Sequence, residues 1–243
     1  MALTDNLIAH YKMDAASGGE TDVHGNNDLT DNNTVGSGTG KLDGARDFEA
    51  SNNESLHCTD NADLSTGDID WTVACWVNIE SITTGTIVQK AAVSDLEYEL
   101  RLMNSAGGLF NLRVSSGFNF ANLTSVSATK FGNPSLATWY FLVAWHDSVN
   151  NTINIQINNG TVDSASYTHG TYNSSAEFRI GSYAVYSEAF DGLIDSVSFW
   201  KRLLTADERT QLYNSGNGLD YDDWGGGGSP ATTGHHLLLL GVG

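Results

Sequence analysis

Basic residues are scarce in this chain of 243 residues: 11 Lys and Arg stand against 29 Asp and Glu, which gives a formal net charge of −18. Nucleic-acid backbones and anionic lipid surfaces are bound through clustered Lys and Arg, so the charge argues against nucleic acid and membrane as partners. Charged residues make up only 16% of the chain, below the ~25% typical of globular proteins. The polar surface must therefore be built mainly from Asn, Ser, Thr and Gly.

Cysteine is rare as well, because the chain contains only Cys58 and Cys75. A disulfide framework in a small secreted chain typically takes about four to eight cysteines, and no Cys-x-x-Cys pair points to zinc or redox chemistry. Both residues occur in apolar, alternating stretches, where a free cysteine packs as a small hydrophobe. We expect two buried thiols, with a bridge between neighbouring strands as the alternative.

Long apolar runs are missing too. Residues 1–7 have neither a basic region nor an apolar one, so we expect no signal peptide. No stretch approaches the ~20 apolar residues that a membrane span requires. We therefore expect no transmembrane segment either.

What the chain does have is a repeated alternation of apolar with polar or small residues, which is typical of β-strands with one buried face. It occurs in residues 7–13, 71–77, 98–102, 109–114, 153–157, 178–180 and 193–200. Residues 138–145 are apolar throughout and predict a strand buried on both faces. Turn residues such as Asn150-Asn151 and Asn159-Gly160 separate the stretches and suit tight hairpins. The prediction is an all-β fold, a two-sheet antiparallel β-sandwich or jelly roll.

One segment departs from this pattern. Residues 205–208, Thr-Ala-Asp-Glu, form a capping box, in which the side chains of Thr205 and Glu208 each accept from the other's backbone amide. Asn214-Ser215-Gly216 supplies a C-terminal stop. One short helix is therefore predicted near residues 205–214.

The composition changes abruptly after Trp224. Residues 225–229, Gly-Gly-Gly-Gly-Ser, are a flexible linker by composition, with an engineered linker as the alternative. They lead to an apolar segment that contains Leu237, Leu238, Leu239 and Leu240. We predict a jelly-roll domain over residues 1–224, followed over residues 225–243 by a Gly-rich linker and an apolar C-terminal segment.

Catalytic motifs are also missing. The chain has no Gly-x-Ser-x-Gly elbow, P-loop, Gly-x-Gly-x-x-Gly run or His-Glu-x-x-His. Glycoside hydrolysis needs two carboxylates close in space, which jelly-roll β-glucanases place on one strand as Glu-x-Asp-x-x-Glu. The nearest runs, Asp68-Ile69-Asp70 and Glu97-Tyr98-Glu99, are incomplete, and we interpret both as solvated strand faces. Hydrolysis of glycans is disfavoured.

Oxygen-rich loops are better represented. Ca²⁺ takes about six to eight oxygen ligands, which Asp, Asn and loop carbonyls supply. Residues 14–28 hold a set of such side chains around Gly25: Asp14, Asp22, Asn26, Asn27 and Asp28. Turn formation is the alternative role of each of them.

Three stretches share the pattern of a known family. They are Leu7-Ile8-Ala9-His10-Tyr11-Lys12-Met13-Asp14 with Asp22-Val23-His24-Gly25-Asn26-Asn27; Gly44-Ala45-Arg46-Asp47-Phe48 with Trp71-Thr72-Val73-Ala74-Cys75-Trp76-Val77; and Gly192-Leu193-Ile194-Asp195-Ser196-Val197-Ser198-Phe199-Trp200 with the helix that follows. In this order, over residues 7–216, they resemble the laminin-G-like (pentraxin-type) jelly rolls of the concanavalin A-like lectin/glucanase superfamily. Trp71 stands where that family has Phe.

The resemblance implies two packed antiparallel sheets in which the first and last strands are adjacent, so that Asp14 and Asp195 could approach one another near the 22–27 loop. Many members hold a structural Ca²⁺ in this region. Our candidate metal ligands are therefore Asp14, Asp22, Asn27 and Asp195, with turn formation as the alternative for each. The family binds sugars, proteins and lipids through loops that vary, so the resemblance does not name a ligand.

Aromatic residues in Asn-, Ser- and Gly-rich segments are candidates for a sugar site, because a pyranose stacks on a ring while polar neighbours bond its hydroxyls. The candidate ligand-binding residues are Tyr172, Tyr183, Tyr186 and Phe118, with Phe120 and Tyr167 beside them. Core packing is the alternative role for each ring.

The sequence thus favours a non-enzymatic binding protein displayed outside a cell. We predict a virion (phage) surface or capsid decoration protein, because a phage protein reaches the outside by lysis and needs no signal peptide. A free bacterial glycan-binding adhesin is the alternative, and a glucanase-like hydrolase is the third reading. The predicted partners are a glycan or a capsid or tail protein, with homo-oligomer formation or assembly through Leu237 to Leu240, which could add a strand to a neighbour or dock in a groove.

Overall fold

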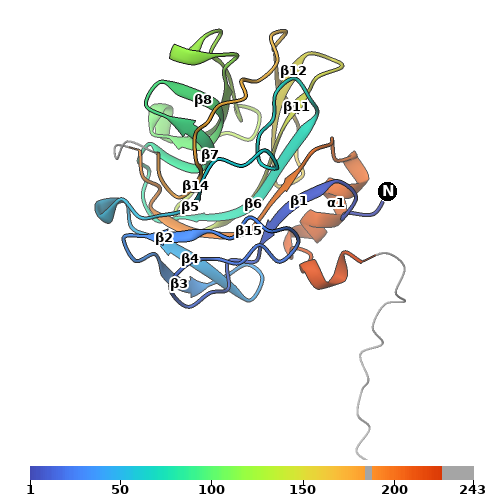
Figure 1. Ribbon diagram of the computed structural model, residues 1–243. Coiled ribbons are helices and arrows are strands. Elements are labelled where there is room, and N and C mark those ends of the chain that lie inside the picture. The colour runs from blue at the N-terminus through green and yellow to red at the C-terminus, as the bar shows by residue number, and fades with distance from the viewer. Residues whose placement is uncertain (184–187, 226–243) are drawn as a thin grey trace, which may run out of the picture.

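Two antiparallel β-sheets pack face to face in the computed structural model (Figure 1), which describes residues 1–183 and 188–225. One sheet has eight strands in the order β13 (Asp163–Ser166), β12 (Thr152–Ile157), β11 (Trp139–Asp147), β6 (Trp71–Ile79), β15 (Gly192–Trp200), β4 (Gly44–Phe48) and β3 (Gly36–Thr39), with β1 (Leu7–Tyr11) also paired to β15. The other has seven, in the order β10 (Thr124–Ser127), β9 (Leu109–Val114), β8 (Asp95–Met103), β7 (Gly85–Ala92), β14 (Phe178–Ile180), β5 (Ser55–Cys58) and β2 (Thr30–Asn32). The predicted β-sandwich is confirmed.

The helical elements are few and short. The α-helix α1 spans Ala206–Tyr213, and Thr205 and Glu208 form the predicted capping box at its start. Short 3₁₀ helices occupy Ala50–Asn52, Ser105–Gly107, Phe118–Phe120, Asn214–Gly216 and Tyr221–Asp223. The helix predicted near residues 205–214 is therefore confirmed.

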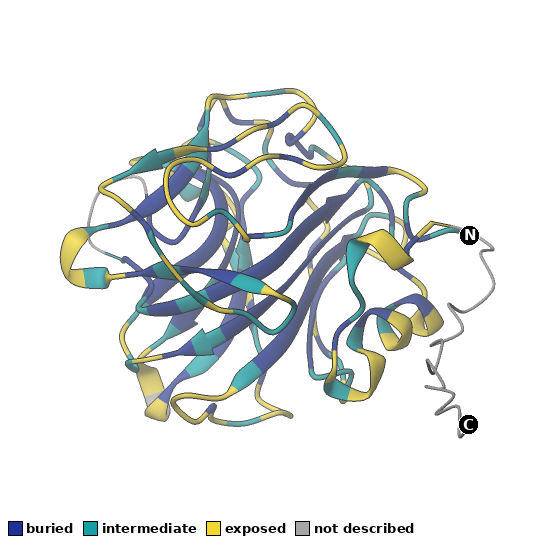
Figure 2. Cartoon of the chain, turned by 90° about the horizontal axis from the view of Figure 1, so that it is seen from below, coloured by how far each residue is buried: buried dark blue, intermediate teal, exposed yellow. Residues whose placement is uncertain are grey.

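The main hydrophobic core lies between the sheets. The rings of Trp71, Tyr98 and Phe199 are buried there, and the ring centroids of Tyr98 lie 5.1 Å from Trp71 and 5.7 Å from Phe199. Strand β11 is buried along nearly its whole length, as the uniformly apolar run predicted. Figure 2 shows the same division, with buried strands inside and exposed residues on the connecting loops.

A second apolar cluster lies on the outer face of the eight-stranded sheet. Trp76, Phe141 and Trp200 point outward there and are covered by Leu212 of α1 and by Trp224. Figure 1 shows α1 beside β1 at this face. The C-terminal part of the domain is thus packed against the sheet, and the sheet is apolar on both sides.

The first and last strands are neighbours, as the family resemblance implied. Strand β1 pairs antiparallel with β15, with Leu7 opposite Trp200 and Tyr11 opposite Val197. Where β15 pairs with β6 its register shifts between Asp195 and Ser198, and Ser196 takes a positive φ of 51°. This irregularity lies at the point where the candidate metal ligand Asp195 is placed.

The turn prediction holds, and the prediction of two buried free thiols holds for Cys75 but only in part for Cys58. Asn151, Asn158 and Asn159 take positive φ values in the hairpin loops where the sequence indicated tight turns. Cys58 and Cys75 are free, the first half-buried and the second buried. In the part of the chain that the structure describes, no helix is both long and apolar enough to cross a membrane.

Candidate functional site

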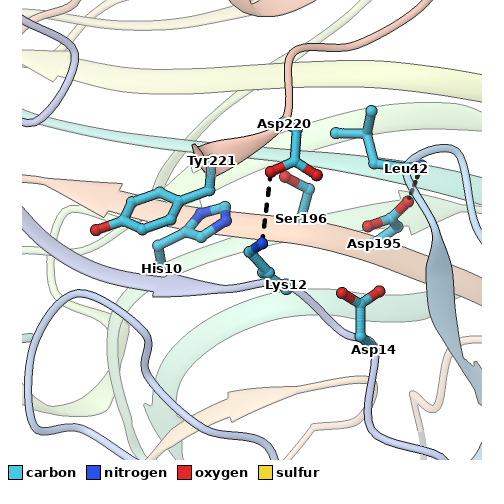
Figure 3. Close-up of a pocket in the computed structure, with 8 residues that line it drawn as sticks. All are labelled: His10, Lys12, Asp14, Leu42, Asp195, Ser196, Asp220 and Tyr221. Carbon is cyan, nitrogen blue, oxygen red and sulfur yellow. Dashed lines mark hydrogen bonds and ion pairs between the residues drawn. The ribbon is translucent and has the colours of Figure 1, made fainter. Parts of the chain in front are cut away.

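A small polar pocket opens between β1, β15 and the segment that follows α1 (Figure 3). It is lined by His10, Lys12, Asp14, Leu42, Asp195, Ser196, Asp220 and Tyr221, and its cavity volume is about 10 Å³. That is the space that one water molecule needs. The pocket can therefore hold a single small guest, such as a water molecule or one ion.

Asp195 is the buried carboxylate of this pocket. Its Oδ2 accepts hydrogen bonds from the backbone N–H groups of Lys41 (2.7 Å) and Leu42 (2.8 Å). Its Oδ1 is shielded from solvent and has no hydrogen-bond partner in the described part of the chain. Burial raises the pKa of Asp195 to about 8, against the two backbone hydrogen bonds and with a contribution from nearby Asp14. At neutral pH this carboxyl group therefore tends to hold a proton, unless a cation takes the place of that proton.

A glycine makes the loop around Asp195 possible. A Cβ built on Gly40 would lie 1.8 Å from the Gly44 carbonyl oxygen and 2.8 Å from Oδ2 of Asp195. No larger residue fits there without moving the loop. Gly40 thus allows the backbone of residues 41 and 42 to approach Asp195 closely.

Asp14 and Asp220 add two further carboxylates to the pocket. Asp14 is exposed and accepts from the Gly44 N–H at 2.8 Å. Asp220 lies 3.4 Å from the Lys12 ammonium group, which also contacts Asp222 at 2.9 Å. In Figure 3 the side chains of Lys12, Asp14, Asp195 and Asp220 face one another. Only Lys12 supplies positive charge within the pocket lining.

His10 closes the other end of the pocket. Its Nδ1 lies 2.8 Å from the Ser198 hydroxyl, and its ring stacks on Tyr221 with centroids 4.5 Å apart. Burial, helped by nearby Lys12, lowers the pKa of His10 to about 3. The imidazole is therefore neutral at physiological pH and serves as a packing and hydrogen-bonding group.

The other two predicted metal ligands, Asp22 and Asn27, do not line this pocket. Oδ1 of Asp22 accepts from the backbone N–H groups of His10, His24 and Gly25, and its Oδ2 accepts from the backbone and side-chain amides of Asn27. The Asn27 side-chain oxygen accepts from Asn61 at 2.6 Å. These side chains hold the 22–27 loop together, as the turn alternative expected.

Two of the four predicted ligands thus fit a hard cation such as Ca²⁺. Asp195 presents a buried oxygen that lacks a partner among the described residues, and Asp14 shares its pocket. Carboxylates are the oxygen ligands that Ca²⁺ prefers. Asp22 and Asn27 do not fit, because their oxygens already accept from neighbouring amides.

The structure also contains a second acidic cluster, which the sequence analysis did not predict. Asp47, Glu49 and Glu80 offer carboxylate oxygens within 4.8 Å of one another; Asp47 is half-buried and the other two are exposed. Burial raises the pKa of each; the charge of Asp191 adds to this effect for Asp47, and the charge of Asp47 adds to it for Glu49 and Glu80. Exposed carboxylates of this kind are common without an ion, so this group is a weaker candidate for a metal site than the pocket.

The interpretation of Glu97 and Glu99 as part of a solvated strand face is wrong, because both side chains are buried. Glu97 accepts from the Ser174 amide at 3.1 Å and lies 3.2 Å from the ammonium group of Lys90. Glu99 contacts the Thr86 hydroxyl at 2.5 Å and the guanidinium of Arg113. A strict strand period would place both on one face, but the register of β8 against β7 shifts at Glu97, and other segments cover both side chains. Asp68 is exposed and Asp70 half-buried.

The aromatic candidates divide by burial. Phe118 is 59% exposed, and Tyr172 is half-buried. Tyr167 and Tyr183 are buried, with hydroxyls that donate to the carbonyls of Gly170 and Ala92. Phe120 packs beside Tyr183. Tyr186 lies outside the described residues, as do Leu237 to Leu240.

Phe118 and Tyr172 come from loops that meet at one end of the sandwich. The Tyr172 N–H donates to the Ser115 carbonyl (2.8 Å), and the Asn119 N–H donates to the Ser94 carbonyl (2.7 Å). Asn119 and Phe120 both take positive φ values, 56° and 57°, which are strained for a bulky side chain such as Phe. The exposed Phe118 ring thus lies directly before two residues with a strained backbone.

The chain belongs to the concanavalin A-like lectin/glucanases superfamily, because the Laminin_G_3 profile of that superfamily matches residues 50–208, more than half of its length. No curated protein matches it by sequence. The profile match confirms the family that the three sequence stretches resembled.

Several solved structures share the fold. The binding domain of Paraclostridial Mosquitocidal Protein 1 aligns with a TM-score of 0.69 and 15% identity, over 88% of this chain and 53% of that chain. Domain 4 of the extracellular arabinanase AbnA from Geobacillus stearothermophilus, solved in complex with arabinotriose, aligns with a TM-score of 0.64 and 19% identity. This alignment covers 85% of this chain and 97% of that domain. The receptor-binding domain of botulinum neurotoxin mosaic serotype C/D aligns with a TM-score of 0.67 and 13% identity, over 88% of this chain and 51% of that chain. This chain spans about half the length of the two toxin domains.

Proposed function

We propose that this protein is a non-catalytic module that binds a glycan outside the cell, at the loop end that carries Phe118. The observation that carries the proposal is the Phe118 ring, which is 59% exposed on a strained loop. Strained, exposed loop positions cluster at ligand sites, and an exposed ring is the platform on which a sugar face stacks. The arabinotriose complex of a similarly folded domain is consistent with this ligand class.

We propose a module without catalytic activity, because the two carboxylates that most resemble a glucanase pair are buried inside the protein. Glu97 and Glu99 are buried and engaged with Ser174, Lys90, Thr86 and Arg113. A general acid and its partner must reach the glycosidic bond. These two carboxylates cannot do so without opening the structure.

Binding of arabinotriose and of a glycan array to the full chain tests the proposal. We expect Phe118→Ala to weaken binding about tenfold through loss of ring stacking, and Tyr172→Ala to weaken it less. Leu123→Ala is the matched control, because Leu123 is a 46% exposed apolar residue of the same loop without a ring. If Phe118→Ala binds glycans as well as wild type, the loop end is not the glycan site.

We also propose that Asp14 and Asp195 bind a structural Ca²⁺. Burial raises the pKa of Asp195 to about 8, so positive charge beside its carboxylate is favoured, and the pocket has room for one ion. Ca²⁺ at 100 times its Kd would add about 2.7 kcal/mol to the free energy of unfolding, which raises Tm by roughly 5–10 °C for a chain of this size.

Calorimetric melting with Ca²⁺ and with EGTA measures this effect. Asp195→Asn keeps the acceptor for the two backbone amides but cannot form a carboxylate, so its Tm should be the same in both buffers. Glu80→Gln, in the exposed acidic group, is the control and should keep the full shift. An equal Tm for wild type in both buffers would refute the proposal, and loss of the shift in Glu80→Gln would move the ion to the other group.

The virion-surface setting, with a bacterial adhesin as its alternative, stays a prediction, as does assembly through the C-terminal segment. Light scattering of the full chain and of a chain that lacks residues 225–243 tests the assembly step. An oligomer that becomes monomeric on truncation would support docking through residues 237–240. An oligomer that survives truncation would assign assembly to the jelly roll itself.

A further inference from the structure

One lysine lies inside the sandwich. The side chain of Lys90, on β7, is 0% exposed. Strand register places Lys90 opposite Phe178 on one side and Tyr98 on the other, and both of these rings belong to the main core. Directly opposed residues of antiparallel strands share a face. Lys90 therefore extends from the inner face of the seven-stranded sheet, where a lysine is almost never found unless it is paired.

Two carboxylates meet the Lys90 ammonium group. Its Nζ lies 2.8 Å from Oδ1 of Asp60 and 3.2 Å from Oε2 of Glu97. It also donates to the Ser174 carbonyl at 2.6 Å. An amine, a carboxyl group that it contacts and a second carboxyl group beside it are the three groups that amide formation between side chains requires.

Glu97 is held in place on the side away from solvent. The register of β8 against β7 shifts at Glu97, and such a bulge re-aims a side chain. The Thr66 hydroxyl (2.7 Å) and the Thr66 N–H donate to Oε1 of Glu97, and the Ser174 N–H donates to Oε2 at 3.1 Å. The side chain of Glu97 is 0% exposed. Its Oε2 is thus fixed beside Lys90 and shielded from bulk water, as a proton carrier needs to be.

Asp60 approaches Lys90 from a different part of the sheet. It lies in the loop that follows β5, and β5 and β7 are both paired with β14 instead of with each other. Figure 1 shows the three strands side by side. The Asp60 side chain is 42% exposed, so a small product released at its carboxyl group has a path to solvent.

The distance and the burial both favour a condensation of these two side chains. Because Oδ1 is bonded to Cγ of Asp60, its 2.8 Å separation from Nζ brings Nζ and Cγ near the ~3–3.5 Å at which fixed groups react. In water an ammonium and a carboxylate remain ionised. Burial of such ions costs free energy, and a neutral amide removes one charge of each sign from this site.

We infer that Lys90 and Asp60 form an intramolecular isopeptide bond, with Glu97 as the proton carrier. Oε2 of Glu97 accepts a proton from the ammonium group, and the neutral Nζ attacks Cγ of Asp60. The new C–N bond forms and one C–O bond of Asp60 breaks. The proton on Glu97 and a second proton from the nitrogen go to the leaving oxygen, which departs as water. Glu97 acts first as general base and then as general acid, and no oxidant or reductant is needed.

The bond would close a loop over residues 60–90 and tie β5 to β7 across β14. A crosslink of this kind restricts the unfolded chain as a disulfide does, in a chain whose two cysteines are free. The inference is independent of the glycan site and of the Ca²⁺ site proposed above.

Mass spectrometry of the denatured full chain tests the inference. We expect a mass about 18 Da below that of the sequence, because one water is lost. The sequence has no Lys or Arg between Arg46 and Lys90, and the next one is Arg101. Trypsin does not cleave after a lysine whose amine is in an amide. Digestion should therefore give one peptide of residues 47–101, about 18 Da lighter than its sequence, in place of cleavage at Lys90.

Four variants assign the roles. Lys90→Arg keeps the positive charge but lacks the amine, and Glu97→Gln lacks the proton carrier, so both should show the full mass. Asp60→Asn keeps a carbonyl carbon and should lose ammonia, about 17 Da, instead of water. Glu99→Gln is the matched control, because Glu99 is equally buried on β8 but contacts Arg113, and it should keep the loss of water. Circular dichroism melts show whether each variant is folded.

Wild-type protein with the full mass and normal cleavage at Lys90 would overturn the inference and leave only an ion pair. A loss of about 18 Da with normal cleavage at Lys90 would also overturn it, because a cyclic imide at another aspartate has that signature. A crosslink that persists in folded Glu97→Gln would overturn the role of Glu97. A crosslink that is present in wild type and Glu99→Gln, and absent from Lys90→Arg and Glu97→Gln, supports the inference in full.

Discussion

The outer faces of the two sheets are built from opposite kinds of side chain. On the eight-stranded sheet Trp76, Phe141 and Trp200 point outward and are sealed by α1 and Trp224. On the seven-stranded sheet the corresponding side carries a row of polar side chains that strand register places opposite one another: Thr30, His57, Arg179, Gln89, Glu99, Arg113 and Ser125. We call this set the polar row. Both sheets bury their inner faces in the same core.

The apolar outer face contributes to stability, whereas the polar outer face is available for recognition. A sheet of a sandwich needs only one buried face, so the second apolar face of the eight-stranded sheet adds stability by binding α1, Trp224 and the N-terminal residues. Leu3 and Leu7 at the N-terminus join this second cluster. The outer face of the seven-stranded sheet is left for polar contacts, and three of the nine buried side-chain atoms that lack a partner among the described residues lie there, on His57, Gln89 and Arg179.

If the apolar face holds the domain together, Trp200→Ala should cause the largest loss in the free energy of unfolding. Trp200 is fully buried, stacks on Trp224 with centroids 5.7 Å apart, and donates from its indole N–H to the Leu3 carbonyl (2.7 Å). Loss of a buried Trp typically costs about 3–5 kcal/mol. Urea unfolding followed by circular dichroism measures it.

Trp200→Phe is the control, because it keeps a buried ring and should lose clearly less stability. The comparison between the faces would fail if Trp200→Ala cost no more than a substitution on the polar face. In that case the cover formed by α1 would be dispensable for the sandwich.

Acid should weaken the apolar face through His10, which packs between Tyr221 and Trp224. Burial lowers its pKa to about 3 from about 6.5 in an unfolded chain. A lowered histidine pKa means that the unfolded state binds the proton first, so this contribution to stability is present above pH 6.5 and is lost as the pH falls toward 3. The loss is about 2 kcal/mol between pH 7 and pH 5.

Urea unfolding at pH 7 and pH 5, for wild type and for His10→Asn, isolates this term. Asn can still bond the Ser198 hydroxyl but does not titrate, so its stability should change less between the two pH values. Equal changes in both proteins would show that His10 is not the group responsible. Asp195, with its raised pKa, shifts stability in the opposite direction and is common to both proteins.

Several features could be predicted from the sequence because each depends on local pattern. The capping box of Thr205 and Glu208, the strand β11 and the hairpin asparagines need only neighbouring residues to be recognised. The proximity of Asp14 and Asp195 followed from the family resemblance. Such features depend on nothing beyond the chain segment itself or its known relatives.

Other features depend on contacts between distant segments. Asp22 and Asp195 were both predicted as metal ligands, yet the oxygens of Asp22 accept from local amides, while one oxygen of Asp195 has no partner among the described residues. Glu97 and Glu99 lie on β8, whose register against β7 shifts at Glu97, and only the tertiary structure shows this shift and the cover over both side chains. The polar row requires the register of every strand in its sheet, which no local period reports.

The smallest predicted effect is on the polar face, at Glu188, whose carboxylate lies 3.4 Å from Arg101 and 3.5 Å from Arg113. Its side chain is 29% exposed, so Glu188→Gln should cost at most about 1 kcal/mol. This cost should shrink in 1 M salt, where the Debye length is only ~3 Å, whereas the cost of Trp200→Ala should persist there because it does not depend on charge. Urea unfolding of both variants at low and high salt measures the contrast. A large, salt-independent loss in Glu188→Gln would mean that the segment over the polar row is part of the stability core, and the polar face would then be no freer for a ligand than the apolar one.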